Sequence, residues 1–561
     1  MSIFFELEYW KFLPVRHCLD VMHIEKNVCD NIIGTLLEIP GKNKDGIAAR
    51  LDILEMGVKS DFGPEYGEKR TRLPPSTWNL SKAEKRIVCK SFYGMKTPEG
   101  YASNVKSLVS MEDLKLYGLK SHDCHTLMQQ LLPIAIQSVL EKPVRYAIIR
   151  LCLFFNDICN KVIDVSRLDK IQDDVVVTLC LLEKYFPLSF FDVMIHLVVH
   201  LVREIRLCGP VFFRWMYPFE RFMKVLKGYV RNRNRPEGCV AQCYIGEEAS
   251  DFCSDFLSNV STIGIPSRKN MARTQPLSGA DVQFVDRDLL DQAHLCVLEN
   301  RNEVQPYISE HMEHLRNTHP KYKKRTKWLQ DKHNRTFIGW LRDRVGYEIN
   351  HGSNEVMESL RWLADGPCMQ VPKYKSYIVN GVHFDTKSRD EMRVVQNSGV
   401  HLVAKTMQVS SAKDKNPIVS DMSFYGVITE IWELDYHKFR IPIFKCDWVE
   451  NNNGIKIDEL GFILANLGRV GYKNDQFVLV GLVKQIFYIE DPLDSKWSVV
   501  LSTPNRDSND YDSDDVLGDI VIDHEPFTRG MPPIETFADV VDENRTQYMR
   551  DDCEDIWIDK E

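Results

Sequence analysis

The chain has 561 residues, of which 44% are hydrophobic and 27% charged, and its formal net charge is −9 at neutral pH. This length and composition predict several globular domains and exclude a short disulfide-rich peptide. The 15 cysteines are scattered without paired spacing, a usage typical of a reducing compartment. Neither a signal peptide nor an apolar stretch long enough to span a bilayer is recognisable, so we expect a protein that is not secreted and does not enter a membrane.

The net charge is unevenly distributed. From Pro504 onward the chain carries about 18 acidic and about 5 basic residues, a local balance of about −13, which leaves the preceding residues at about +4. This tail has too few apolar side chains to fold alone, so we expect it to be disordered. We expect it to serve solubility; competition with DNA for a basic surface, or histone binding, is the alternative.

Six segments follow one another along the chain. They are a mostly helical segment at 1–59, a linker rich in Gly, Pro and charge at 60–81, a helical domain at 82–263, a basic and irregular linker region at 264–398, a small β-rich domain at 399–504 and the acidic tail at 505–561. The expected fold class is α+β and multidomain, with a mostly α-helical N-terminal half and a small all-β barrel or sandwich near the C-terminus.

Apolar residues recur at helical spacing through both helical segments. In 1–59 a first helix ends before Pro40-Gly41, and a second runs through ARLDILEMG. In the helical domain this spacing appears in MQQLLPIAIQSVL, PVRYAIIRLCLFFNDICNKVI, VVVTLCLLEKYF and SFFDVMIHLVVHLVREI. Pro133 lies within the first of these, and we expect it to kink or break the helix because proline lacks an amide hydrogen.

The region 264–398 is looser, with a short helix predicted at DRDLLDQAHLCVLENR. It also contains a basic cluster of Lys321, Lys323, Lys324, Arg325 and Lys327. Basic clusters of this size often occur by chance. The alternative is a nuclear-import signal or a phosphate-binding ridge. Trp328 and Trp340 lie nearby in the sequence and could add nucleic-acid contacts to such a ridge.

The segment 399–504 changes to the pattern of strands. VITEIWELDY, FRIPIFKCDWV, FILANL, QFVLVGLVKQIFYIED and KWSVVLS are rich in β-branched and aromatic residues and are separated by turns. Five or six short strands predict a small barrel or sandwich. We expect Tyr425, Trp432, Tyr436 and Trp448 in its core, with an aromatic cage of the kind used by chromatin readers as the alternative.

The stretch from Phe190 to Gly238 is the most informative for function. His196 and His200 lie four residues apart on an apolar helical pattern, so both rings project from one face and could share a metal ion. Packed or capping histidines are the more common interpretation of such a pair. A zinc-protease helix is nearly excluded, because Leu197 stands where a glutamate is needed.

Glu220 follows Pro218 in what is predicted to be the first turn of a new helix. A single acid there more often complements the helix dipole than it performs catalysis. A basic run follows, which alone would usually be a solvated face: Arg221, Lys224, Lys227, Arg231, Arg233 and Arg235. Taken together, the histidine pair, the acid and the basic run favour a site that acts on a phosphate backbone.

A second acidic candidate lies near the N-terminus. Asp20, His23 and Glu25 are close enough in sequence to share a metal ion. We favour a buried helix whose polar residues hydrogen-bond to neighbours. The sequence HDCH at 122–125 raises the same question; its aspartate is placed to cap the following helix, and a second metal cluster is the alternative.

Longer blocks of the chain resemble plant CACTA (En/Spm-type) transposases. The shared features, in order, are the His-x3-His pair of His196 and His200, Gly209-Pro210 and Pro218-Phe219-Glu220. The resemblance extends upstream through SIFFELEYWKFLPVRHCLDVMHIEKNVCDNIIGTLLEIPGKNKDGIAARLDI and GLKSHDCHTLMQQLLPIAI, and downstream to YVRNRNRPEG and SFYGVITEIWELDYHKFRIPIFKCDWV. It covers nearly all of the chain before the acidic tail.

The resemblance implies an RNase H-fold nuclease in which two aspartates and a late glutamate hold two Mg²⁺ or Mn²⁺ ions. Glu220 matches the late glutamate, with Asp20 and Glu25 as the alternative acids. His196 and His200 match half of a structural zinc site whose other half is a Cys-x2-Cys. By the same resemblance, 1–59 is the C-terminal end of a transposase core, and 82–263 and 399–504 are transposase-associated domains.

The matching aspartates and Cys-x2-Cys belong to family segments that precede this sequence, and the chain contains no substitute Cys-x2-Cys. One carboxylate cannot hold two metal ions, so we expect the isolated chain not to be an enzyme. We also expect it to hold neither the divalent metal nor zinc tightly. The predicted DNA contacts are Lys224, Lys227, Arg231, Arg233 and Arg235.

Three functions remain as hypotheses. The preferred one is a truncated CACTA-type transposase-derived protein, inactive alone, with residual DNA binding. The alternatives are a host-adopted DNA- or chromatin-binding protein, and the C-terminal part of an active transposase whose gene model lost its N-terminus. Expected partners are DNA, such as transposon ends, and full-length transposase, with no membrane and no small-molecule substrate. We expect nuclear localisation, or cytoplasmic if the basic cluster is no import signal.

Overall fold

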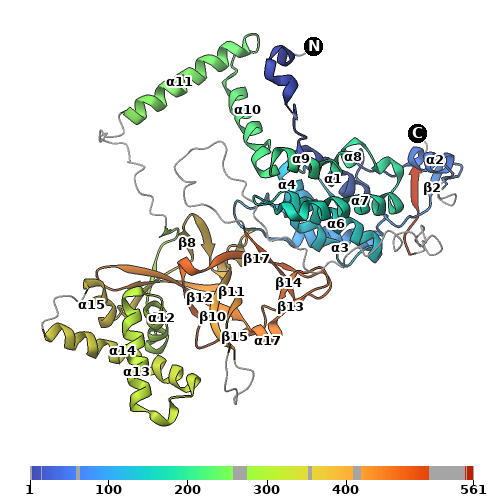
Figure 1. The fold of residues 1–561 in the computed structure, drawn as a ribbon. Helices are drawn as coiled ribbons and strands as arrows, with labels where there is room; N and C mark the ends of the chain where they lie inside the picture. Colours follow the sequence, from blue (N-terminus) through green and yellow to red (C-terminus); the bar gives the residue numbers. More distant parts are fainter. Residues whose placement is uncertain are drawn as a thin grey trace.

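The computed structural model describes residues 3–13, 15–57, 63–256, 274–351, 357–408, 418–503, 550 and 552–559. They form a helical half, which runs to α11, and a β-rich half, which begins at β5 (Figure 1). The predicted fold class, α+β with a mostly helical N-terminal half, is confirmed. Most of the predicted acidic tail, residues 504–549, lies outside the described residues.

The helical half contains helices in the stretches that the apolar spacing predicts and others that the sequence analysis does not predict, such as those at 82–94 and 236–256. They are α1 (Val21–Leu36), α2 (Ile47–Glu55), α3 (Lys82–Gly94), α4 (Ser121–Thr126), α5 (Leu132–Ala135), α6 (Lys142–Ile158), α7 (Leu168–Tyr185), α8 (Val193–Val198), α9 (Leu201–Cys208), α10 (Tyr217–Tyr229) and α11 (Pro236–Phe256). Short strands lie between them: β1 (Glu65–Tyr66), β2 (Arg70–Leu73), β3 (Val109–Ser110) and β4 (Lys115–Leu116). In α6 the buried residues Val144, Ile148, Leu151 and Phe155 recur every three or four positions, so this helix lies along the centre of the core.

Pro133 interrupts the helix in which it lies, as expected. A π-helical turn, Leu127–Leu131, separates α4 from α5, and Pro133 stands in the first turn of α5. Because proline has no amide hydrogen to donate to the turn before it, the backbone widens there. The widened turn places the side chains of Gln129 and Gln130 inside the core.

The segment 63–81 is not the linker that its Gly and Pro content predicts. The Trp78 side chain is fully buried, and its indole nitrogen donates to Asp45 Oδ2 at 3.0 Å. Arg50 of α2 donates to both oxygens of the same carboxylate, at 2.6 and 2.8 Å. The buried ion pair and the indole fix this segment against α2, so its glycines and prolines mark tight turns in a packed region.

The β-rich half is built on one antiparallel sheet. Among the described residues its strands follow the order β13-β14-β18-β17-β10-β11-β12-β15; β16 also pairs with β12, and β7 pairs with both β11 and β6. Their bounds are β6 (Asp281–Phe284), β7 (Gln370–Tyr374), β10 (Gly399–Gln408), β11 (Ile418–Asp435), β12 (Arg440–Val449), β13 (Ile455–Ile457), β14 (Ile463–Ala465), β15 (Val470–Gly471), β16 (Phe477–Leu479), β17 (Lys484–Glu490) and β18 (Ser498–Ser502). A separate small sheet contains β5 (Thr274–Pro276), β8 (Ser376–Val379) and β9 (Val382–Asp385).

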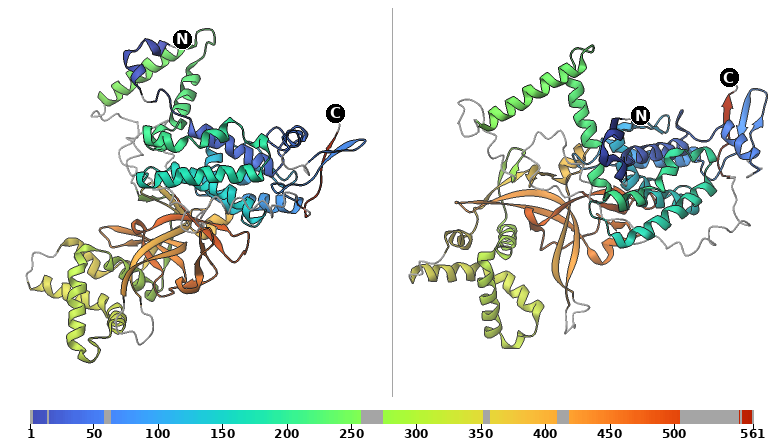
Figure 2. Two further views of the ribbon diagram at one scale, coloured as in Figure 1. Left: turned by 45° about the vertical axis from the view of Figure 1, so that its right-hand side comes forward. Right: turned by 45° about the horizontal axis from the view of Figure 1, so that its top comes forward.

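The long central strands of the large sheet curve (Figure 2). A register shift between Ile428 and Glu430 bends β11 against β12. At Gly426 a Cβ atom would lie 2.7 Å from the Trp448 ring, so only glycine permits this close approach. The small helix α17 (Asn451–Gly454) follows β12.

The region 264–398 differs from the irregular linker that the sequence predicts, although 257–273 and 352–356 lie outside the described residues. It contains α12 (Arg287–Glu299), α13 (Gln305–Thr318), α14 (Thr326–Asn350), α15 (Glu358–Asp365) and α16 (Lys387–Met392) as well as strands of both sheets. The long helix α14 buries a single stripe, Leu329, His333, Phe337, Leu341 and Val345. One stripe in an otherwise polar helix leaves little apolar periodicity in the sequence, which is why the helix is hard to predict.

The two halves share one core. Leu460, Phe462 and Phe487 of the β-rich half belong to the same cluster of buried side chains as the helices. The rings of Tyr101 and Phe487 meet edge to face with centroids 4.9 Å apart. Gln137 also donates to Asp458 Oδ2 at 2.8 Å, so polar contacts reinforce the apolar ones.

A polar joint lies between the halves. His383 Nδ1 is 2.7 Å from Glu99 Oε2, and His383 Nε2 is 2.6 Å from Ser376 Oγ. This connectivity is that of a serine–histidine–acid triad, but Ser376 is fully buried and cannot meet a substrate. The neighbouring carboxylates of Asp385 and Glu99 raise the pKa of His383 against the effect of burial.

The end of the chain returns to the helical half. The strand β19 (Ile556–Asp559) pairs with β2, and Arg550 donates to both oxygens of Glu84, at 3.0 and 3.1 Å. This corrects the prediction of a wholly disordered tail for these last residues, which carry Ile556, Trp557 and Ile558 among the acids. No helix in the described part of the chain is long and apolar enough to cross a membrane.

The polar joint predicts a pH-dependent contribution to stability. A histidine with a raised pKa stabilises the fold fully below its unfolded pKa of about 6.5, and this contribution is lost as pH rises through the folded pKa. In urea titrations followed by tryptophan fluorescence, His383→Gln should lower the free energy of unfolding by roughly 1 kcal/mol more near about pH 6 than near about pH 9. The exposed His23, changed to Gln, is the control; an equal cost of His383→Gln at both pH values would contradict the ion pair.

Candidate functional site

The histidine pair faces outward from the helical half. His196 lies on α8, and His200 precedes α9; their Nε2 atoms are 3.3 Å apart, and both side chains are exposed. Two nitrogens bound to one tetrahedral zinc ion at about 2.0–2.1 Å would be separated by about 3.3 Å. The pair therefore has the spacing of two corners of a zinc site.

The helix that carries His196 is held at its start by Asp192. The Asp192 carboxylate accepts hydrogen bonds from the backbone of Met194 and Ile195, at 3.0 and 3.2 Å. Although burial opposes it, hydrogen bonds from Asn31 and Lys44 hold the pKa of Asp192 below its usual value. This cap ties α8 to α1 and fixes the direction of the histidine rings.

No third metal ligand joins this pair within the described residues. Where three His, Cys, Asp or Glu side chains converge in the described residues, the group contains neither His196 nor His200. A tetrahedral zinc site at this pair would need further ligands from outside the described residues.

Glu220 lies where the sequence predicts, in the first turn of α10. Its side chain is exposed, and the neighbouring Tyr217 is buried. Neither Glu220 nor Asp20 belongs to a group of three converging ligands among the described residues. This donor set does not fit a two-metal nuclease site, which requires several carboxylates around one point.

The N-terminal acids separate onto different faces. Asp20 caps α1 by accepting from the backbone nitrogen of His23 at 3.2 Å, and the His23 side chain is exposed. Glu25 instead points into the core, where 2% of its surface is exposed. Asp20, His23 and Glu25 therefore do not share a metal ion.

Glu25 meets His125, one hundred positions away. Glu25 Oε2 lies 2.6 Å from His125 Nδ1, and Gln129 donates to Glu25 Oε1 at 3.1 Å. His125 belongs to α4, and Gln129 belongs to the widened turn before Pro133. The sequence marks each segment separately as unusual, and the fold brings the two together.

Cys159, at the end of α6, completes what we call the polar centre: Glu25, His125, Gln129 and Cys159. Glu25, His125 and Cys159 each offer a ligand atom, and these atoms lie within 4.8 Å of one another. Burial, with the nearby charge of Glu25, raises the pKa of the Cys159 thiol well above its usual value. Sequence reasoning missed Cys159 because a cysteine on an apolar helix is usually a small buried hydrophobe.

Aromatic rings connect the polar centre to α10. The Trp215 ring lies edge-on to His125 with centroids 4.6 Å apart, and the Tyr217 ring lies 6.4 Å away. Burial first, then the charge of Glu25, raises the pKa of the Tyr217 phenol. Burial and the charge of His125 lower the pKa of His122 to about 4. The polar centre thus lies directly beneath the start of α10.

The arm, which we define as α10, α11 and the turn between them, projects beyond the packed helices (Figures 1 and 2). Tyr229 of α10 donates to Glu247 of α11, and this bond raises the pKa of Tyr229 to about 12. Five basic side chains of the arm are exposed and make no ion pair with the described part of the chain: Lys224, Lys227, Arg231, Arg233 and Arg235.

The basic cluster at 321–327 and the proposed aromatic cage differ in outcome. The basic side chains between Lys321 and Lys327 are exposed at the start of α14, whereas Trp328 is stacked on Tyr322 with centroids 4.3 Å apart. The four aromatic residues proposed as a cage are all buried, and they belong to three separate core clusters: Tyr425, Trp432, Tyr436 and Trp448. These four side chains form core and not a cage.

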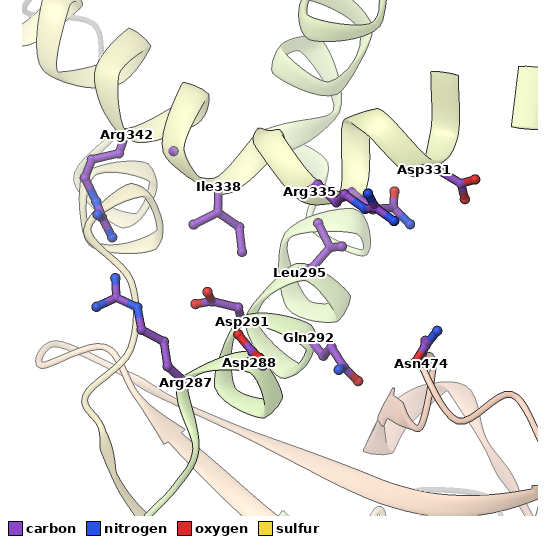
Figure 3. A pocket seen from close by; sticks show the side chains of 12 residues that line it. Arg287, Asp288, Asp291, Gln292, Leu295, Asp331, Arg335, Ile338, Arg342 and Asn474 are labelled. Carbon is purple, nitrogen blue, oxygen red and sulfur yellow. The ribbon is translucent and has the colours of Figure 1, made fainter. Parts of the chain in front are cut away.

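A cavity of about 570 Å³ lies between α12 and α14 and reaches Asn474. Figure 3 shows Arg287 and Arg342 toward one end of this cavity and Arg335 toward the other. Asp288, Asp291 and Asp331 also line it, so opposite charges are mixed around its wall. Burial raises the pKa of Asp291. The sequence contains no signal for this cavity, because charges on helices are usually a solvated face.

The buried contact between Glu25 and His125 predicts a clear effect of a single substitution. Glu25→Ala takes the carboxylate partner from His125 in a dry core, so the free energy of unfolding should fall by about 1–3 kcal/mol. Adding His125→Ala should cost less than in the native background, because the pair is already broken. Urea titration followed by circular dichroism measures this, with the exposed Glu55→Ala as control; additive costs would contradict a direct pair.

Two family models match parts of the chain. A domain of unknown function (DUF4218) matches residues 158–271, and a second domain of unknown function (DUF4216) matches residues 432–500. The first range includes the histidine pair, Glu220 and the arm. No curated protein and no solved structure matches the chain. The chain thus contains two domains of unknown function that are typical of plant transposase-derived proteins.

Proposed function

We propose that this chain is a CACTA-type transposase-derived protein that binds DNA through the arm and does not cut or join DNA by itself. The observation that carries the proposal is a set of basic side chains that make no ion pair within the described residues, on an arm that projects from a protein of net negative charge. The sequence blocks shared with CACTA transposases support the family. The match to DUF4218 over the arm also supports it.

The electrostatics of the arm favour a phosphate backbone as the ligand. Basic side chains that already pair with carboxylates gain little from a phosphate, because they must first lose a partner. Lys224 and Lys227 lie three positions apart on α10, so they share one helical face, and the arginines follow in the turn. Such a row can neutralise successive phosphates without reading the bases.

The acids of the chain support inactivity. Metal-dependent strand cleavage needs two ions held between several carboxylates, which activate water and stabilise the leaving oxygen. Glu220 is exposed and has no converging pair of ligands in the described residues. Glu25 is occupied by His125, and Asp20 caps α1.

One observation favours a second candidate, the C-terminal part of an active transposase. The 3.3 Å separation of His196 and His200 suits zinc, and a segment or partner that supplied two cysteines would complete the site. The exposed cluster from Lys321 to Lys327 supports nuclear import in either case. Exclusion of a fluorescent fusion from the nucleus would contradict that part of the proposal.

Neutralising the arm should weaken DNA binding in a salt-dependent way. We expect the triple variant Lys227→Gln, Arg231→Gln and Arg233→Gln to bind a mixed-sequence duplex at least about tenfold more weakly at low salt, with the slope of log K against log salt reduced by about 2 to 3. Fluorescence anisotropy over a salt series measures both quantities.

The matched control neutralises three exposed lysines of the β-rich half, Lys438, Lys484 and Lys496, also to Gln. This control should retain the affinity and the slope of the native chain. Equal losses in both triple variants would mean that only net charge matters, and the arm would not be the site.

The proposal also predicts the absence of nuclease activity. With Mg²⁺ or Mn²⁺, the purified chain should leave a supercoiled plasmid intact, and Glu220→Ala should behave like the native protein. Nicking by the native chain that disappears in Glu220→Ala would contradict inactivity and would make Glu220 a catalytic residue. Nicking that persists in the variant would indicate a contaminating nuclease, which repurification removes.

A further inference from the structure

The polar centre contains more ligand chemistry than its hydrogen bonds use. Glu25 comes from α1, His125 from α4 and Cys159 from the end of α6, and all three side chains are at most 4% exposed. Their ligand atoms lie within 4.8 Å of one another. Carboxylate, imidazole and thiol are the three side-chain types that bind zinc.

Two residues beside the polar centre have a buried polar atom without a hydrogen-bond partner among the described residues, Asn156 Oδ1 and Tyr217 Oη. Asn156 donates to the Gln129 carbonyl at 3.5 Å, and the centroid of the Tyr217 ring lies 6.4 Å from that of the His125 ring. A buried polar atom without a partner costs about 1–3 kcal/mol, so two such atoms beside the polar centre favour a further ligand there.

We propose that Glu25, His125 and Cys159 form a buried zinc site, separate from the pair of His196 and His200. Zinc fits this mixed set better than Mg²⁺ or Mn²⁺, which prefer oxygen ligands alone. On binding, the Cys159 thiol loses its proton to solvent and the sulfur donates its electron pair to the metal. One thiolate and one carboxylate then balance the two charges of the ion, which makes burial of the ion favourable.

The contact between Glu25 and His125 needs only a small change. The Glu25–His125 contact of 2.6 Å is shorter than the separation of about 3.3 Å between two tetrahedral ligands, so the carboxylate moves by less than about 1 Å when the ion enters. Gln129 keeps the second carboxylate oxygen in place. A water molecule would supply the fourth ligand of a tetrahedral ion. The ion joins α1, α4 and α6 beneath the base of the arm, so its role is structural.

The test is the metal content of the full chain after expression with added zinc and dialysis against a weak chelator. Elemental analysis should find one zinc per chain. The variant Cys159→Ser should lose it, whereas Cys152→Ser, a buried cysteine of the same helix, should keep it. The double variant His196→Gln and His200→Gln should also keep it, which separates this site from the histidine pair.

Cobalt provides a second readout, which begins with the native chain. Replacement of zinc by Co²⁺ in the native chain should produce a thiolate-to-cobalt absorption band in the near ultraviolet, and Cys159→Ser should abolish that band. A native chain that holds no metal, or a zinc ion that survives Cys159→Ser and is lost with the histidine pair, would overturn the proposal. DNA binding by the arm is measured separately, so either proposal can fail alone.

Discussion

The burial of a carboxylate and an imidazole at the centre of the helical half is the constraint on which the rest of the structure depends. Taking an unpaired carboxylate out of water costs several kcal/mol, so Glu25 can lie in the core only if α4 brings His125 to it. This pairing fixes the approach of α1 to α4. The widened turn before Pro133 then supplies Gln129 to the second carboxylate oxygen.

Aromatic rings connect this buried pair to the surface of the helical half. Trp215 and Tyr217 pack on His125, and α10 begins at Tyr217. The direction of the arm is therefore set by buried contacts at its base, whereas its basic side chains extend into solvent. A rigid base with an exposed basic row suits binding to a charged polymer, because little ordering is needed on contact.

The sequence predicts local features of this fold well and distant ones poorly. Apolar periodicity places α6 and α7, alternation places the strands around Trp432, and Pro218 marks the start of α10. The periodicity fails for α14, whose buried stripe is only one residue wide and includes His333. Glycine and proline around Trp78 suggest a linker, although that indole is buried, because turn residues occur in packed and in flexible segments alike.

The residues of the candidate site can be predicted only where they lie close together in the sequence. The histidine pair, Glu220 and the arm lie within one stretch and are visible from spacing alone. The meeting of Glu25, His125 and Cys159 depends on the packing of three helices, and no local pattern encodes it. Closeness in sequence can also mislead. Asp20 stands five residues before Glu25, and yet it caps the helix on another face.

Hydrogen–deuterium exchange of the full chain, with and without a DNA duplex, tests the central claim most directly. The account predicts that DNA slows backbone exchange in residues 217–235 and leaves β10 to β12 unchanged. Slower exchange confined to residues 321–327 or to the large sheet would contradict it, because DNA would then bind away from the arm that the polar centre positions.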